Sequence, residues 1–500
     1  MDLEQARVEF AILQKKICAF NHADNLIYFD GETTAPPGTG YNRAQALDGI
    51  NEILQRLKSG PETLELLDFL NENRDWLSVK ERRAVDHLLK ERARMKNIPP
   101  EEVGRYTALI TESQELWSQA REENDFGILA PKLEEIVKTK RDFAKYNMPD
   151  KDPYDYCIDQ YEERLNTDTL DELFYPIKEE IPTLLKQIKE KPQVDDSFLK
   201  GDFSEEDLQE LAVYILDLIG VDLDYVGLGK AEHPFNIPLG SHFDERIALR
   251  YDNLSLDALL YTVLNRGGYA LYELGQAENL AYTVLDSAAS LSLTESQARY
   301  YENIIGRSRS FIEHIYPELV ELFPIPLGSH SPEELYKAVN KVEVGPIRMN
   351  SDELSYNLHI MVRYELEKAM IHGDLPVKDL PDAWNQKYRE YLGVEVKDDL
   401  SGVLQDAHWS IGIFGYFPLY LLGNVFSAQI AQKMGEEINI YDYVEEGNFK
   451  LINFWNKEKI WKYGGLFYTR EIMEKYVGAP VSSDPYIAYL RNKYKEIYQL

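Results

Sequence analysis

The chain has 500 residues, of which 44% are hydrophobic and 12% aromatic, and its formal net charge is −32. This composition indicates a globular protein rather than a disordered one, and the charge excludes nucleic acid and anionic membranes as general partners. Two cysteines, Cys18 and Cys157, suggest no disulfide framework, and the first residues lack the pattern of a signal peptide. We therefore expect a cytoplasmic protein.

Helical periodicity dominates the first part of the chain. Apolar residues recur at intervals of three and four, which predicts amphipathic helices. These helices are expected over residues 3–24, 42–58, 80–96, 99–122, 126–147, 169–190 and 204–218, with a loop over residues 30–40. Pro176 and Pro182 are expected to kink or divide their helix. Ser204, followed by three acidic residues, has the composition of a helix N-terminus.

The pattern changes over residues 221–252, where Gly, Pro and alternating apolar residues predict two or three short strands. Helices then return over residues 255–273, 290–322, 332–341, 353–372, 381–391 and 421–433, and Gly275 is expected to end the first of them. No charged residue occurs over residues 407–432, but Pro418 and several Gly residues interrupt this stretch. We expect a buried wall and a core helix there rather than a membrane span.

Several motifs follow one another along the second half of the chain. They are HPF at 233–235, DERIALRYD at 244–252, TVLNRGGYALYELG at 262–275, TESQARYYENIIGRSR at 294–309, IRMNSD at 347–352 and GVLQDAHW at 402–409. In this order they resemble the carboxypeptidase Taq family of zinc metallocarboxypeptidases. The resemblance begins with FDGETTAPPG near the N-terminus and continues to PYIAYLRNKY near the C-terminus.

The resemblance implies a mainly α, saddle-shaped, metallopeptidase-like fold with a deep central groove and a small β-sheet near residues 221–252. It implies a single domain over residues 1–500, in which an N-terminal helical part (about 1–200) flanks the groove. The core, residues 201–500, would carry the former active site. The resemblance also implies a homodimer, as is usual in the family, whose members remove C-terminal residues from peptides.

The family holds zinc with H-E-x-x-H on one helix and a Glu of the motif H-E-S-Q on the next. Two His side chains at i and i+4 lie on one face of a helix and can bind one zinc ion. The third ligand leaves a coordination position for water. The metal lowers the pKa of this water to about 7, and the Glu inside the first motif accepts its proton.

Aligned on the family motif, the two His positions fall on Asn265 and Tyr269, the catalytic Glu on Arg266 and the third ligand on Glu295. An amide is a poor zinc ligand, a phenol stays protonated at pH 7, and a guanidinium cannot act as a base. The resemblance thus implies a vestigial metal site formed by Asn265, Tyr269 and Glu295. We expect no catalytic residue, no bound metal and no cofactor.

A buried Glu295 without a metal ion would need another cation, because an unpaired buried carboxylate is costly. We expect Arg266 to supply this charge through an ion pair with Glu295. Asn265 and Tyr269 would fill the volume of the two imidazoles and complete the polar network.

The substrate-binding motifs of the family are better preserved than its catalytic motif. The resemblance implies that Arg246, Arg348, His233 and His408 line the groove, and the two arginines suit a peptide carboxylate. In an alternative interpretation, each arginine is merely paired with a nearby acid in a core.

The sequence therefore predicts a homologue of metallocarboxypeptidases that has lost catalysis, because the H-E-x-x-H motif reads Asn265-Arg266-Gly267-Gly268-Tyr269. Such a protein would bind peptide C-termini in the groove or act as a regulatory or partner subunit. The alternative is an active carboxypeptidase with a reorganised metal site. A duplicate that folds without a function is a third interpretation.

Overall fold

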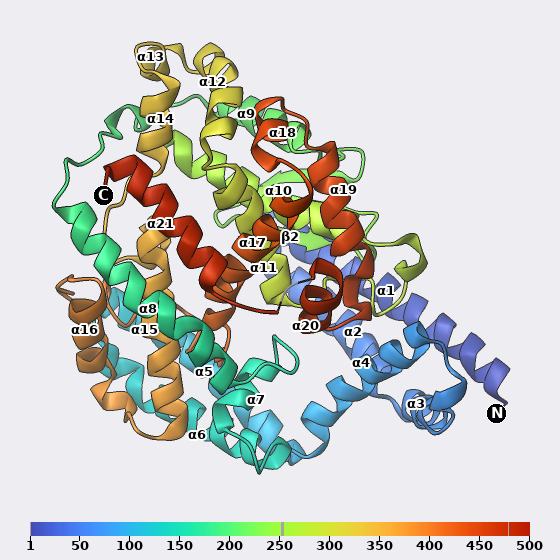
Figure 1. Ribbon diagram of the computed structural model, residues 1–500. Helices are drawn as coiled ribbons and strands as arrows, with labels where there is room; N and C mark the ends of the chain where they lie inside the picture. Colours follow the sequence, from blue (N-terminus) through green and yellow to red (C-terminus); the bar gives the residue numbers. More distant parts are fainter. Residues whose placement is uncertain (1, 252–254, 479) are drawn as a thin grey trace. The chain divides into compact units, whose positions relative to one another are not determined.

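A computed structural model describes residues 2–251, 255–478 and 480–500 (Figure 1). The contacts within the chain define two compact units, each assembled from segments that are distant in sequence. Unit 1 comprises Met1–Arg92, Asp196–Val339 and Ile430–Val481, and unit 2 comprises Ala93–Asp195, Asn340–Gln429 and Ser482–Leu500. The expectation of a single domain stays a prediction.

Unit 1 is mainly helical and contains the small sheet. Its helices are α1 (Leu3–Thr33), α2 (Gly40–Ser59), α3 (Pro61–Glu72), α9 (Glu205–Leu218), α10 (Leu256–Leu274), α11 (Leu291–Arg299), α12 (Arg309–Leu322), α13 (Pro324–Leu327), α14 (Pro332–Val339), α18 (Ile440–Glu445), α19 (Lys450–Lys459) and α20 (Thr469–Glu471). A π-helical segment, η6 (Tyr300–Ile305), lies between α11 and α12. Helices α4 (Val79–Lys96) and α17 (Phe417–Glu437) contribute residues to both units.

The sheet confirms the short strands predicted over residues 221–252. Residue 252 lies outside the described residues. The three strands are β1 (Val226–Lys230), β2 (Phe235–Pro238) and β3 (Glu245–Leu249), in the order β1-β3-β2. Strand β3 pairs in parallel with β1 and antiparallel with β2. As the central strand it is the most buried, and it carries the buried carboxylate of Glu245.

Helix α10 is buried on several faces, as expected for a helix inside a core. Two consecutive glycines allow its neighbours to approach. A Cβ on Gly268 would lie 2.7 Å from the backbone oxygen of Gln297 in α11, and a Cβ on Gly267 would lie 2.5 Å from the Ile219 side chain. The two glycines therefore serve close packing, which offsets the cost of glycine in a helix.

Unit 2 consists of helices α5 (Pro100–Glu123), α6 (Ala130–Asn147), α7 (Pro153–Asp159), α8 (Thr167–Lys189), α15 (Glu353–His372), α16 (Leu380–Tyr391) and α21 (Asp484–Tyr498). Helix α8 continues through Pro176 and Pro182 without division. Helix α15 is largely buried, and it begins where the Asp352 carboxylate accepts the backbone N–H groups of Leu354 and Ser355.

Candidate functional site

Six polar residues gather where α10 meets α11 and η6 in unit 1. Asn265, Arg266 and Tyr269 come from α10, Glu295 and Arg299 from α11, and Glu302 from η6. We call this set the Glu295 cluster. Asn265 and Tyr269 are one helical turn apart and share a face of α10. Only 7% of Asn265 and 4% of Glu295 are exposed, so the cluster is largely removed from water.

Both carboxylate oxygens of Glu295 are occupied by donors. Arg299 donates its Nε–H to Oε1 at 2.7 Å, and the Tyr269 hydroxyl donates to Oε2 through a short hydrogen bond. Arg299 also reaches Glu302, with Nη1 3.1 Å from Oε2, and the Asn265 amide donates to the same oxygen at 2.7 Å. The amide and the phenol thus take part in the network, as predicted.

The cation that pairs with Glu295 is Arg299, and not Arg266 as the sequence had suggested. The Arg266 guanidinium instead lies over the ring of Tyr269, with its carbon 4.7 Å from the ring centre. Such a contact is a favourable cation–π interaction. The reason for the difference is helical spacing, because Arg299 follows Glu295 by four residues on one helix and needs no rearrangement to reach it.

The Glu295 cluster is balanced in charge, with two carboxylates and two guanidinium groups. Within this cluster, Oδ1 of Asn265 is buried and has no hydrogen-bond partner among the described residues. Among residues 2–251, 255–478 and 480–500, no group of three or more His, Cys, Asp and Glu side chains is placed to hold a metal ion.

Two further predicted residues, His233 and Arg246, belong to the sheet region of unit 1. His233 is exposed in the loop before β2. Arg246 in β3 forms an ion pair with Asp244 at 2.6 Å, and a quarter of its side chain is exposed. The neighbouring Asn236 links the sheet to α10, because its amide donates to Glu245 at 3.0 Å and to the backbone oxygen of Arg266 at 3.1 Å.

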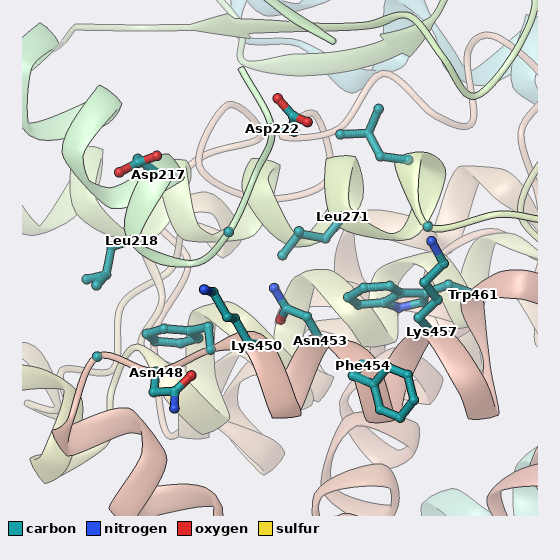
Figure 2. A pocket seen from close by; sticks show the side chains of 15 residues that line it. Asp217, Leu218, Asp222, Leu271, Asn448, Lys450, Asn453, Phe454, Lys457 and Trp461 are labelled. Carbon is teal, nitrogen blue, oxygen red and sulfur yellow. The ribbon is translucent and has the colours of Figure 1, made fainter. Parts of the chain in front are cut away.

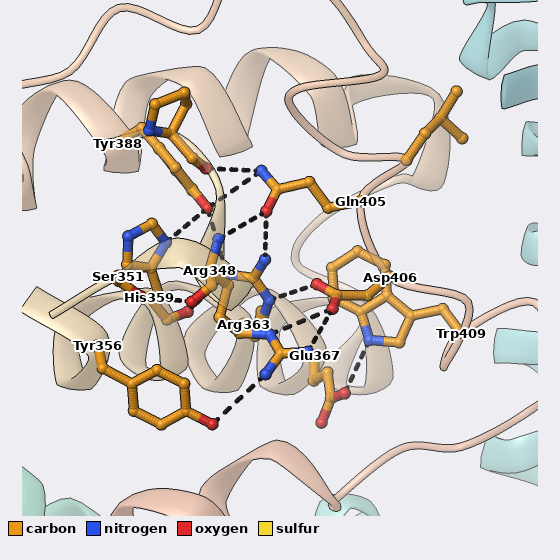
Figure 3. Close-up of polar contacts among 12 residues, drawn as sticks. Arg348, Ser351, Tyr356, His359, Arg363, Glu367, Tyr388, Gln405, Asp406 and Trp409 are labelled. Carbon is orange, nitrogen blue, oxygen red and sulfur yellow. Dashed lines mark hydrogen bonds and ion pairs between the residues drawn. The ribbon is translucent and has the colours of Figure 1, made fainter. Parts of the chain in front are cut away.

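The other predicted arginine, Arg348, belongs to a buried polar cluster in unit 2 (Figure 3). Arg348 and Arg363 share one carboxylate, that of Asp406. The Nη2 of Arg348 lies 2.9 Å from Oδ1, and the Nε of Arg363 lies 2.6 Å from Oδ2. Gln405 accepts from both residues, at 3.1 Å in each case. We call this set the Asp406 cluster.

Two acids have displaced pKa values here: Asp406 itself, and Glu367, whose carboxylate is influenced by the charge of Arg363. The two guanidiniums hold the pKa of Asp406 well below its usual range despite the opposing effect of burial. Burial raises the pKa of Glu367 to about 7, although its carboxylate accepts from Tyr154 at 2.6 Å and from Trp409 at 2.7 Å. With one ionised acid between two arginines, and Glu367 partly protonated at pH 7, the cluster has an excess of positive charge.

His408 lies beside this cluster in contact with the ring of Phe417, with ring centres 4.5 Å apart. Burial, reinforced by the nearby arginines, lowers the pKa of His408 to about 4, so the imidazole is neutral at pH 7. Its Nδ1 is buried and has no hydrogen-bond partner among the described residues.

Four residues of the two clusters were not predicted as site residues, although all of them lie within the predicted helices or the motifs of the sequence: Arg299, Glu302, Arg363 and Asp406. Arg299 could have been found from its i, i+4 spacing to Glu295. Asp406 and Arg363 come from segments more than 40 residues apart, and only the fold brings them together.

Comparison with known proteins agrees with this fold. The carboxypeptidase Taq (M32) metallopeptidase family matches residues 9–494. The chain is 34% identical over 504 aligned residues to carboxypeptidase 1 of Bacillus subtilis, covering 100% of both chains. It is 31% identical to thermostable carboxypeptidase 1 of Pyrococcus furiosus, covering 96% of each. The crystal structure of an M32 carboxypeptidase from Deinococcus radiodurans R1 has a TM-score of 0.96 at 30% identity, over 99% of this chain and 100% of that one.

The chain therefore belongs to the carboxypeptidase Taq (M32) metallopeptidase family. This confirms the resemblance seen in the motifs and the mainly α fold. Within the described part of the chain, no helix combines the length and apolar character needed to cross a membrane.

Proposed function

We propose that this chain does not hydrolyse peptide bonds by a zinc mechanism, and that it binds peptide C-termini through Arg348. The observation that carries the first part is the engagement of both Glu295 oxygens by Arg299 and Tyr269. Arg299 already supplies Glu295 with the positive charge that a zinc ion would otherwise provide. The nearby cations Arg266 and Arg299 would also repel a divalent ion.

The donors on α10 do not fit a zinc ion either. Zinc in proteins prefers imidazole, thiolate and carboxylate ligands, and α10 offers the amide of Asn265 and the phenol of Tyr269. Arg266 lies between these two residues in the sequence, and its guanidinium remains protonated and cannot accept a proton from water. These features support a non-catalytic role for the cluster.

The binding of a peptide carboxylate is supported by the charge of the Asp406 cluster. Two guanidiniums share one Asp, so an additional anion would balance the cluster. The Nη1 of Arg348 has only a long contact, at 3.4 Å, with the hydroxyl of Tyr356. A planar guanidinium with donors to spare can bind a carboxylate through paired hydrogen bonds.

The first test is metal content. The purified chain is incubated with zinc, desalted and analysed by mass spectrometry, and hydrolysis of a blocked dipeptide is measured in parallel. We expect metal near zero and no zinc-dependent hydrolysis. A variant carrying Asn265→His, Arg266→Glu and Tyr269→His serves as the positive control. If the unmodified chain retains about one zinc that is lost in Glu295→Ala, and also hydrolyses the peptide, the chain is an active carboxypeptidase with a reorganised metal site.

The second test compares an N-acetylated peptide with a free C-terminal carboxylate and the same peptide as its C-terminal amide. We expect the amide, or an Arg348→Gln variant, to bind at least about tenfold more weakly, because a charge-assisted hydrogen bond is lost. Arg363 still neutralises Asp406 in this variant, and circular dichroism checks that the fold is retained. Arg389→Gln, an exposed change in the same unit, is the control. Equal binding of acid and amide would rule out recognition of the C-terminus.

A further inference from the structure

A pocket of about 680 Å³ lies in unit 1, on a side of α10 that the Glu295 cluster does not use (Figure 2). Leu271, which lines the pocket, follows Tyr269 by two residues and so points to the opposite side of the helix. The other walls are the end of α9 with the turn after it, and helix α19. The volume is within the range of about 300–1,000 Å³ that is usual for small-molecule sites.

Opposite charges face each other across this pocket. Asp217 and Asp222 lie on one side, and Lys450 and Lys457 extend from α19 on the other (Figure 2). The two lysines are seven residues apart, so they project from one side of α19 about 10 Å from each other along its axis. In the part of the chain that the structure describes, none of these four side chains forms an ion pair. Their charges are therefore available to a ligand.

The floor of the pocket is apolar and its wall is held in place. Leu271 and Trp461 are almost fully buried, and Leu274 lies beside them. Asn453 fixes the wall, since its amide donates to the backbone oxygen of Ile219 at 2.8 Å and its Oδ1 accepts from the Tyr301 hydroxyl. The site is thus formed before a ligand arrives, which favours binding.

We propose that this pocket binds a short zwitterionic peptide. Its ammonium terminus would face Asp217 and Asp222, and its carboxylate terminus would face Lys450 and Lys457. An apolar side chain would rest on the floor formed by Leu271, Leu274 and Trp461. A ligand with a single sign of charge would be repelled by one wall, whereas a zwitterion satisfies both. The proposal is independent of peptide binding at Arg348, because that residue belongs to unit 2.

The test is calorimetric titration of the dipeptide leucyl-phenylalanine into full-length protein carrying Arg348→Gln, so that the Asp406 cluster does not contribute. EDTA is present, so that no zinc-dependent hydrolysis consumes the peptide. We expect one site per chain. N-acetylation or C-terminal amidation of the dipeptide should each weaken binding at least about tenfold, because each removes one charged terminus.

Two double variants locate the binding site. Lys450→Gln with Lys457→Gln, and Asp217→Asn with Asp222→Asn, should each weaken binding of the free dipeptide by at least about tenfold. Lys459→Gln is the matched control on α19, because Lys459 pairs with Glu437 outside the pocket, and it should bind normally. The four pocket side chains are exposed, so we expect their replacement to leave the fold intact. The proposal is overturned if the capped dipeptides bind as well as the free one, if the double variants bind normally, or if no saturable binding occurs at millimolar dipeptide.

Discussion

Arg299 binds the carboxylates of both Glu295 and Glu302, and only 14% of its side chain is exposed. Without it two adjacent, largely buried acids would lose their shared cation. We expect Arg299→Met to lower the free energy of unfolding by about 3–5 kcal/mol, the usual cost of removing one partner of a buried ion pair. Chemical denaturation monitored by circular dichroism measures the change.

Arg266→Met is the matched comparison for this prediction. It removes a cation–π contact with Tyr269, so we expect it to cost only about 0.5–2 kcal/mol. If Arg266→Met proved as damaging as Arg299→Met, Arg266 would be the main counterion of the cluster after all.

Glu367 gives a prediction about pH. Burial raises its pKa from 4.5 to about 7, so the folded protein holds a proton that the unfolded chain releases near pH 4.5. The resulting stabilisation is complete below pH 4.5 and is lost as the pH rises through 7. Above pH 7 the free energy of unfolding is therefore lower by on the order of 3 kcal/mol. We expect Glu367→Gln to be less stable than the unmodified protein at pH 5, because the amide nitrogen cannot accept a hydrogen bond and both oxygens of the carboxyl group face donors.

The measurement is the denaturation midpoint of this variant and of the unmodified protein at pH 5 and pH 8. The variant should change less between the two pH values, because it carries no titrating group at this position. Glu172→Gln, an exposed change in α8 of the same unit, should keep the pH dependence of the unmodified protein. Parallel pH dependence in Glu367→Gln would contradict the prediction.

At the scale of elements, the contact between α10 and α11 depends on Gly268. A methyl group there would lie 2.7 Å from the oxygen of Gln297 and 2.9 Å from the Cα of Ala298, and backbone atoms cannot move aside as a flexible side chain can. We expect Gly268→Ala to lower the free energy of unfolding by about 1–3 kcal/mol or more through overpacking. Thermal unfolding followed by calorimetry measures the change.

Gly49→Ala in α2 is the control, because nothing lies within 4 Å of a Cβ at that position. There the change should stabilise the protein by about 0.4–1 kcal/mol, since alanine favours the helix and restricts the unfolded chain. A stabilising effect at both glycines would mean that the two helices can move apart.

Most elements could be predicted from apolar spacing and helix-capping residues. The Ser204 N-cap is present, with its hydroxyl accepting from Asp207, and α15 has the predicted bounds. The helix predicted over residues 290–322 is instead α11, η6 and α12. Its apolar spacing continues across this change, and the π-helical turn depends on packing that no local pattern encodes.

One other local prediction was wrong, and one helix was not predicted. Helix α1 continues to Thr33, through part of the predicted loop over residues 30–40, and ends shortly before two prolines that cannot extend it. Helix α3 was missed, although Pro61 and Glu62 at its start are a usual helix-initiation signal.

The net charge of −32 should oppose the compact state of the protein through self-repulsion. We expect the unfolding temperature to rise when sodium chloride is raised from about 0.01 M to about 0.1 M, because the screening length falls from about 30 Å to about 10 Å. Potassium chloride should act equally if screening is the cause. A lower unfolding temperature in salt would mean that the surface ion pairs outweigh the general repulsion.

The candidate site could be predicted only in part, because its residues are recruited from distant segments. The resemblance to the family's motifs pointed to Glu295, Asn265 and Tyr269. The pairing of Arg348 and Arg363 with Asp406 required the fold. The expected roles of Arg246, His233 and His408 in a groove stay predictions.

The interleaving of the two units has a consequence for the gene. The chain re-enters each unit twice before it ends. A premature stop codon after Val339 would deprive unit 1 of Ile430–Val481 and remove Asn340–Gln429 and Ser482–Leu500 from unit 2. Truncation therefore cannot yield one intact half, and a fragment library of this gene should contain soluble products only when nearly the full reading frame is retained.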